Sequence, residues 1–171
     1  MNERLARMTQ AAKSLNLQMQ DGSLVRGVLR EHSQDIMEQQ HIQLLEGKGS
    51  DGNDLRPYYT EDVKPHGYFK TQQTASNYMA WKETLSYPYS VTRNSNAPNL
   101  YINGRFHSEL EVRFEAQVLM IVPSTPYASQ IVRKYGIGRF GLSALKWQVM
   151  MNEKGVKAEI QQRMKNILYG S

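Results

Sequence analysis

Four histidines are the first residues to test for metal or acid–base chemistry. His32, His41, His66 and His107 are scattered along the chain, and no pair shows the i, i+4 spacing around a glutamate that a metalloprotease helix needs. His32 and His41 lie nine residues apart, a rotation of about 180° on a continuous helix. We therefore predict no metal site, and we expect these imidazoles at the surface or at the edge of the core.

A glycine- and aspartate-rich stretch, GKGSDGND at residues 47–54, superficially suggests a phosphate or calcium loop. It lacks the glycine spacing of a phosphate-binding loop, and no apolar strand precedes it. A calcium loop beginning at Asp51 requires a glycine where Arg56 stands and a glutamate where Asp62 stands. Both patterns fail, so we interpret the stretch as a turn-rich loop.

A run of alternating residues supplies the last candidates for paired carboxylates. Apolar Leu110, Val112, Phe114 and Ala116 alternate with polar Glu109, Glu111, Arg113 and Glu115. Strict alternation predicts a strand with one buried and one solvated face. No other residue of the sequence stands in a pattern typical of a catalytic acid or nucleophile. We therefore expect neither catalytic residues nor a cofactor.

The N-terminal part of the chain is predicted to be helical. Leu5, Met8, Ala12, Leu15 and Met19 follow spacings of three and four residues, which places them on one stripe of an amphipathic helix. Asp21-Gly22 ends this arm, residues 1–22. A second helix is expected from Ser23 to about Leu45, roughly 33 Å long.

Two loops are predicted in the middle of the chain, at residues 46–69 and 86–98, because glycine, proline, serine and asparagine concentrate there. A helix is expected between them, at about 70–86. A long loop inside a compact domain is usually functional. The loops also hold aromatic candidates for a subunit interface, namely Tyr58, Tyr59, Tyr68, Phe69, Tyr87 and Tyr89. The alternative is that these rings pack back onto their own domain.

The remaining elements complete an α+β domain over residues 23–171. Residues 118–122 are wholly apolar and predict a second, more deeply buried strand that pairs with the first through a turn at Ala116-Gln117. A helix capped by Thr125 should end at Gly136, and a helical region at 143–168 should break at Gly155. We expect an antiparallel sheet with the N-terminal and C-terminal helices packed against it.

The net charge is modest but uneven. The chain of 171 residues has 21 basic and 16 acidic residues, a formal charge of +5. Residues 133–165 alone contain eight basic and two acidic residues, a net charge of +6. The alternatives are a nucleic-acid contact and ordinary solvated helix faces, because basic residues are favoured near helix C-termini.

The absence of cysteine excludes disulfide scaffolds and thiolate chemistry, and it favours an intracellular origin. No apolar run approaches the roughly 18 residues of a membrane span. The N-terminus lacks the apolar core of a secretory signal. We expect no membrane partner.

Three stretches resemble the small head-tail joining proteins of tailed phages, in the neck, tail-completion and tail-terminator group. The first is LLEGKGSDGNDLRPYY with NYMAWKETL; the second is NLYINGRFHSELEV with VLMIVPSTPYASQIVRKYG; the third is GRFGLSALKWQVM with AEIQQRMKNIL. Their shared order, over about three quarters of the chain, carries the resemblance.

The resemblance implies a noncatalytic virion structural protein, made in the host cytoplasm and located in the neck or tail of the particle. It would form a six- or twelve-fold homo-oligomeric ring between portal and tail, contact portal, adaptor or tail proteins, and let double-stranded DNA pass without specific binding. The N-terminal arm lies outside these stretches. As separate hypotheses, Leu5, Met8 and Leu15 join the loop aromatics at subunit interfaces, and the strand face of Glu109, Glu111, Arg113 and Glu115 is turned to the channel. The alternatives are a DNA-binding accessory protein that uses the basic C-terminal helices, another packaged virion structural protein and, more distantly, a nuclease.

Overall fold

The N-terminal third forms three helices rather than the expected two. Helix α1 (Asn2–Gln20) follows the predicted arm, but the second predicted helix is divided into α2 (Ser23–Glu31) and α3 (Ser33–Leu45). His32 interrupts it with φ −88° and ψ 16°. Backbone hydrogen bonds still cross the interruption, from the His32 amide to the Val28 carbonyl (3.1 Å) and from the Ile36 amide to the His32 carbonyl (2.9 Å). The division is therefore a single-residue joint, not a loop.

The computed structural model describes residues 2–57, 69, 71–92, 96–116 and 118–170. In the middle of the chain it contains α4 (Gln72–Glu83), which begins at a capping box built by Thr71 and Thr74. This helix confirms the one predicted at 70–86. The described parts of the two predicted loops contain no helix or strand beyond an isolated bridge between Lys48 and Asp54.

The strand prediction is confirmed in position and pairing. A short helix, α5 (Arg105–Ser108), precedes β1 (Leu110–Glu115), which pairs antiparallel with β2 (Val118–Pro123) in the register Leu110 to Pro123 and Glu115 to Val118. The second strand is the more buried of the two, as expected: three of the six residues of β1 are exposed, but only Val118 of β2 is. Ile121 is the fully buried residue of β2, Val118 at the start of the strand is 57% exposed, and the other four residues are half-buried.

The C-terminal part contains α6 (Ala128–Tyr135), a 3₁₀ turn (Ile137–Arg139), α7 (Ala144–Asn152) and α8 (Val156–Tyr169). Thr125 does not cap α6 as predicted; it precedes the helix in a tight turn, bonded through its carbonyl to the Ala128 amide. The break at Gly155 is confirmed. Its φ of +81° is a conformation that glycine adopts without strain.

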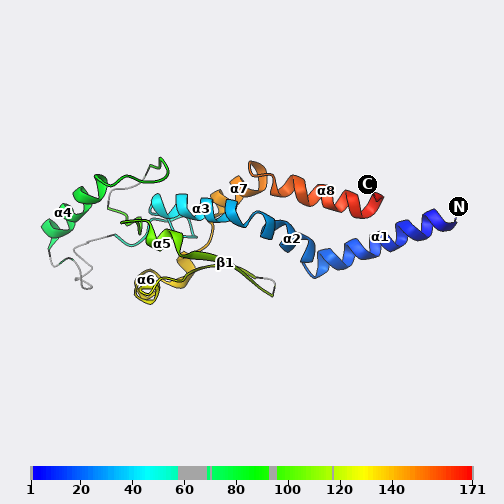
Figure 1. Cartoon of the computed structure of the whole chain (residues 1–171), viewed down its shortest axis with the longest axis horizontal. Coiled ribbons are helices and arrows are strands. Elements are labelled where there is room, and N and C mark those ends of the chain that lie inside the picture. The colour runs from blue at the N-terminus through cyan, green and yellow to red at the C-terminus, as the bar shows by residue number, and fades with distance from the viewer. Residues whose placement is uncertain (1, 58–68, 70, 93–95, 117, 171) are drawn as a thin grey trace.

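Figure 1 shows an elongated chain in which α1 and α8 run antiparallel at one end, with both termini, while α4 lies at the opposite end. Between these ends, α2, α3, the hairpin, α7 and the start of α8 enclose the core. Its fully buried members include Val28, Ile36, Leu44, Met150 and Val156. The α+β class, with N-terminal and C-terminal helices around an antiparallel hairpin, is confirmed.

Buried glutamines on α3 join this helix to the segment before α7. The Gln43 amide nitrogen donates to the Gly141 carbonyl (2.8 Å), and its oxygen accepts from the Ser143 amide (2.7 Å). Gln40 accepts from the Gly141 amide (2.9 Å). Because Gln40 and Gln43 are fully buried, these bonds replace the strand pairing that residues 140–143 lack.

Candidate functional site

The predicted N-terminal interface residues divide between an exposed and a buried part of α1. Leu5 is 67% exposed and Met8 is 49% exposed, whereas Leu15 is buried. All three share one stripe of the helix, and α1 contacts α8 and α2. Leu15 therefore belongs to the contacts within the chain, and Leu5 and Met8 remain available to a partner.

The aromatic candidates are only partly described. Tyr58, Tyr59 and Tyr68 lie outside the described residues. Phe69 lies 5.0 Å from the Tyr78 ring between centroids, and Tyr78 lies 5.4 Å from Trp81. These three rings form a row along α4, and Trp81 is 43% exposed.

Tyr87 and Tyr89 lie on the second loop in different surroundings. Tyr87 packs edge-on against Tyr101 at 5.3 Å and donates through its hydroxyl to the Lys82 carbonyl. Its contacts lie within the chain. Tyr89 lines an open groove together with Met37, His41 and Val112, so it stays a candidate for a subunit contact.

The acidic strand face is arranged as predicted for three of its four members. Glu111, Arg113 and Glu115 project from the exposed side of β1, and Arg113 pairs with Glu111 at 2.9 Å. The bond to Arg113 lowers the pKa of Glu111. Glu109 differs, because it ends α5 rather than standing on the strand, and it accepts from Arg105 at 2.7 Å.

Half of the basic residues at 133–165 pair with acidic residues of the same chain, which reduces the free positive charge of this region. The partners of two of them come from α2 and α3. The pairs are Arg139 with Asp51, Lys146 with Glu46, Lys154 with Asp35 and Glu38, and Arg163 with Glu31 and Glu159. Arg133, Lys157 and Lys165 are exposed.

A buried polar cluster surrounds His107 beneath the second loop. The His107 Nε2 donates to the Asn99 carbonyl (3.0 Å), and His41 donates to the His107 carbonyl (2.9 Å). Burial, reinforced by the charges of His41 and Lys82, lowers the pKa of His107 to about 4. Burial also lowers the pKa of His41. His107 is therefore neutral near pH 7, and its cluster positions the loop at residues 96–101 against α5.

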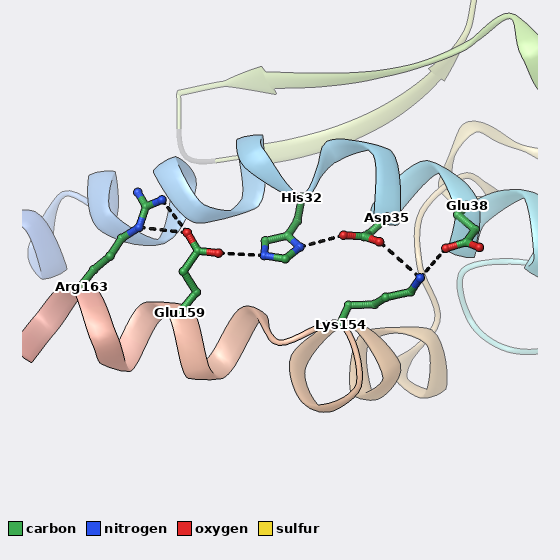
Figure 2. A network of polar contacts seen from close by, with 6 residues as sticks. All are labelled: His32, Asp35, Glu38, Lys154, Glu159 and Arg163. Atoms are coloured by element: carbon green, nitrogen blue, oxygen red, sulfur yellow. Dashed lines mark hydrogen bonds and ion pairs between the residues drawn. The ribbon is translucent and has the colours of Figure 1, made fainter.

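Sequence reasoning missed the polar contacts that join α8 to the α2–α3 joint, which Figure 2 shows. Their signal was an acidic stripe at Glu31, Asp35 and Glu38, spaced by four and three residues on one helical face. Lys154 pairs with Asp35 and Glu38 of this stripe, and Arg163 pairs with Glu31. A charge count by segment omits this pairing, because the acidic partners lie more than 100 residues before Lys154 and Arg163 in the chain.

Two further kinds of site are absent from the described residues. No group of three or more potential ligands lies close enough to hold a metal ion in the described part of the chain. Among the helices of that same part, none is both long and apolar enough to cross a membrane.

Comparison of the chain with protein-family models, with curated proteins and with solved structures finds no match.

Proposed function

We propose that this chain is a noncatalytic virion structural subunit that forms a ring at the junction between portal and tail of a tailed phage. The sequence resemblance supplies the location. The exposed stripe of α1 is the structural observation that supports assembly. Leu5 and Met8 continue the stripe that buries Leu15, so the helix presents apolar surface for which the single chain has no cover.

The shape supports contacts in two directions. α1 lies at one end of the elongated chain, and α4, with exposed Trp81, lies at the other (Figure 1). A closed ring requires two different surfaces on each subunit that meet across every interface. Apolar and aromatic anchors at opposite ends suit such a heterologous contact.

The oligomeric state tests the proposal. We expect native mass spectrometry and negative-stain microscopy of the purified chain to show closed rings, six- or twelve-fold, and microscopy of purified particles to place the protein in the neck or tail. The double variant L5D/M8D should lower the ring population, because it places two charges in an apolar interface.

The variant L17D is the matched control. Leu17 is 63% exposed on the same helix, but it lies about 160° away from the centre of the stripe. Rings that persist in L17D and disappear in L5D/M8D support the proposal. Equal loss in both variants, or rings unaffected by L5D/M8D, contradicts the role given to the stripe, and a monomer under all conditions contradicts the ring.

A DNA-binding accessory protein is the second candidate, favoured by the exposure of Arg133, Lys157 and Lys165. It predicts salt-sensitive binding of a monomer to duplex DNA. The triple variant R133Q/K157Q/K165Q should then reduce the slope of affinity against salt concentration. If the chain forms rings and shows no such binding, this candidate is wrong.

A further inference from the structure

His32 occupies the joint between α2 and α3 and faces α8. Its Nδ1 lies 2.8 Å from an Asp35 carboxylate oxygen, and its Nε2 lies 3.0 Å from a Glu159 carboxylate oxygen. The side chain of His32 is only 16% exposed. Figure 2 shows the ring between these two carboxylates, one on α3 and one on α8.

The contacts continue on both sides of the ring. On one side, Arg163 of α8 pairs with Glu159 (2.5 Å) and with Glu31 at the end of α2. On the other side, Lys154, between α7 and α8, pairs with Asp35 (3.3 Å) and Glu38 (2.5 Å) of α3. We call these seven residues the α8 ladder: Glu31, His32, Asp35, Glu38, Lys154, Glu159 and Arg163.

The geometry at His32 requires a protonated ring. An ionised carboxylate can only accept hydrogen bonds, so each ring nitrogen must donate, and only the imidazolium has two donors. A neutral ring would direct one lone pair at a carboxylate oxygen. Loss of the proton therefore removes one of the two bonds and leaves two carboxylates on either side of an uncharged ring.

The partners favour the charged form of His32. The bond to Asp35 foremost, and then the bond to Glu159, raises the pKa of His32 against the effect of burial. The same contacts lower the pKa of Asp35, mainly through the bond to His32, and the pKa of Glu159, mainly through the bond to Arg163. The pKa of Lys154 and of Arg163 is raised by their carboxylate partners. Histidine is thus the one side-chain type of the ladder that changes charge near neutral pH.

We propose that His32 is a pH-sensitive latch that holds α8 against the α2–α3 joint when it is protonated and loosens α8 when it is neutral. Since the pKa of folded His32 is raised above the ordinary value of 6.5, the stabilisation that the protonated ring gives to the α8 contact is complete below pH 6.5. It is lost as pH rises through the folded pKa. α1 packs on α8, so the loosening extends to the contact between the two terminal helices.

The test is hydrogen exchange of the full chain, measured at the amides of residues 156–169 at pH 5.5 and 8.5 and expressed as protection relative to intrinsic exchange. Each unit of pKa difference changes an opening equilibrium about tenfold, and partial exposure of both carboxylates reduces this. We expect protection of α8 to fall about three- to tenfold at the higher pH. Amides of α4, which lies at the opposite end of the chain from α8 (Figure 1), provide the internal reference.

Two variants separate the latch from other pH effects. H32Q places an uncharged amide at the joint, so α8 should show low protection that does not change between the two pH values. H41Q is the matched control, since among the described residues His41 bonds to the His107 carbonyl and to no member of the ladder, and it should keep the wild-type pH dependence. If H32Q fails to fold, E159Q removes the carboxylate from the α8 side instead and should also abolish the dependence.

The titration of His32 by NMR completes the experiment. A His32 pKa above 6.5, with α8 protection that falls at the same pH, supports the latch. A His32 pKa at or below 6.5 overturns it, and so does α8 protection that is unchanged while His32 titrates. Persistence of the pH dependence in H32Q or E159Q overturns it as well.

Discussion

Residues of one apolar stripe on α1 lie in different surroundings, although burial does not divide the helix into two halves, since Met19 beyond Leu15 is 45% exposed. In the C-terminal half, Leu15 is 9% exposed, whereas Leu5 in the N-terminal half is 67% exposed. Both positions satisfy the same helical period. Periodicity therefore identifies the face of a helix that is apolar, but it does not say whether the chain itself provides the surface that covers it.

The largest contrast is expected between a core residue and the exposed end of α1. Ile36 is fully buried in the cluster with Val28 and Leu44, so I36A should lower the free energy of unfolding by about 2–5 kcal/mol, from lost burial and the remaining cavity. L5A removes a similar side chain and should change the stability of the monomer by less than about 0.5 kcal/mol. Urea denaturation of both variants at low protein concentration measures the difference. Equal destabilisation would show that the monomer covers Leu5 as completely as it covers Ile36.

The glutamine contacts of α3 allow a second comparison, between buried and exposed polar side chains on one helix. Q43L leaves the Gly141 carbonyl and the Ser143 amide without their partners, and each unsatisfied buried group costs about 1–3 kcal/mol. We expect a total loss of about 2–4 kcal/mol by urea denaturation. Q34L, at an exposed position of the same helix, should change little. A Q43L variant as stable as the wild type would mean that residues 141–143 find other partners.

The elements of this fold could be predicted from the sequence where the signal is local. The alternating residues of β1 and the glycine at position 155 specify a strand and a helix break without reference to distant residues. The division at His32 could not be predicted in this way, because the α2–α3 sequence continues a helical period through it. The contacts made there, with Glu159 of α8, lie 127 residues away.

The exposure of the candidate residues could be predicted only where a local pattern specifies it. Glu111, Arg113 and Glu115 are exposed as expected, since alternation on a strand fixes their side directly. The burial of Leu15 and Tyr87 depends on α8 and on Tyr101, and the pairing of Lys154 and Arg163 depends on α2 and α3. Contacts between residues that are distant in the sequence depend on how the elements pack, and sequence periodicity does not predict that packing.

The contributions of His107 and His32 to stability should change with pH in opposite directions, because burial lowers the pKa of His107 and carboxylate partners raise the pKa of His32. The folded pKa of His107 is about 4, below the ordinary 6.5. Its neutral form therefore stabilises the fold above pH 6.5, and this contribution is lost as pH falls toward 4. The loss between pH 7.5 and 4.5 should be about 2–3 kcal/mol.

The variant H107Q isolates this contribution. Glutamine can still donate to the Asn99 carbonyl but does not titrate, so the stability difference between pH 7.5 and 4.5 should be smaller than in the wild type by about 2–3 kcal/mol. The carboxylates titrate in both proteins and cancel in the comparison. An unchanged pH dependence would mean that His107 is accessible to protons in the folded state.

The smallest effect is expected from two ion pairs that differ in exposure. Lys146 and Glu46 lie 2.8 Å apart with side chains 10% and 26% exposed, whereas Arg113 and Glu111 on β1 lie 2.9 Å apart and are about half exposed. K146M keeps the aliphatic stem but leaves Glu46 unpaired, and should cost about 1–2 kcal/mol with little dependence on salt. R113M should have no measurable effect at physiological salt, because water and ions already screen that pair. Since both variants exchange a cation for the same side chain, any difference between them in urea denaturation reports burial rather than charge. A salt-sensitive loss in K146M would place that pair at the surface with the pair on β1.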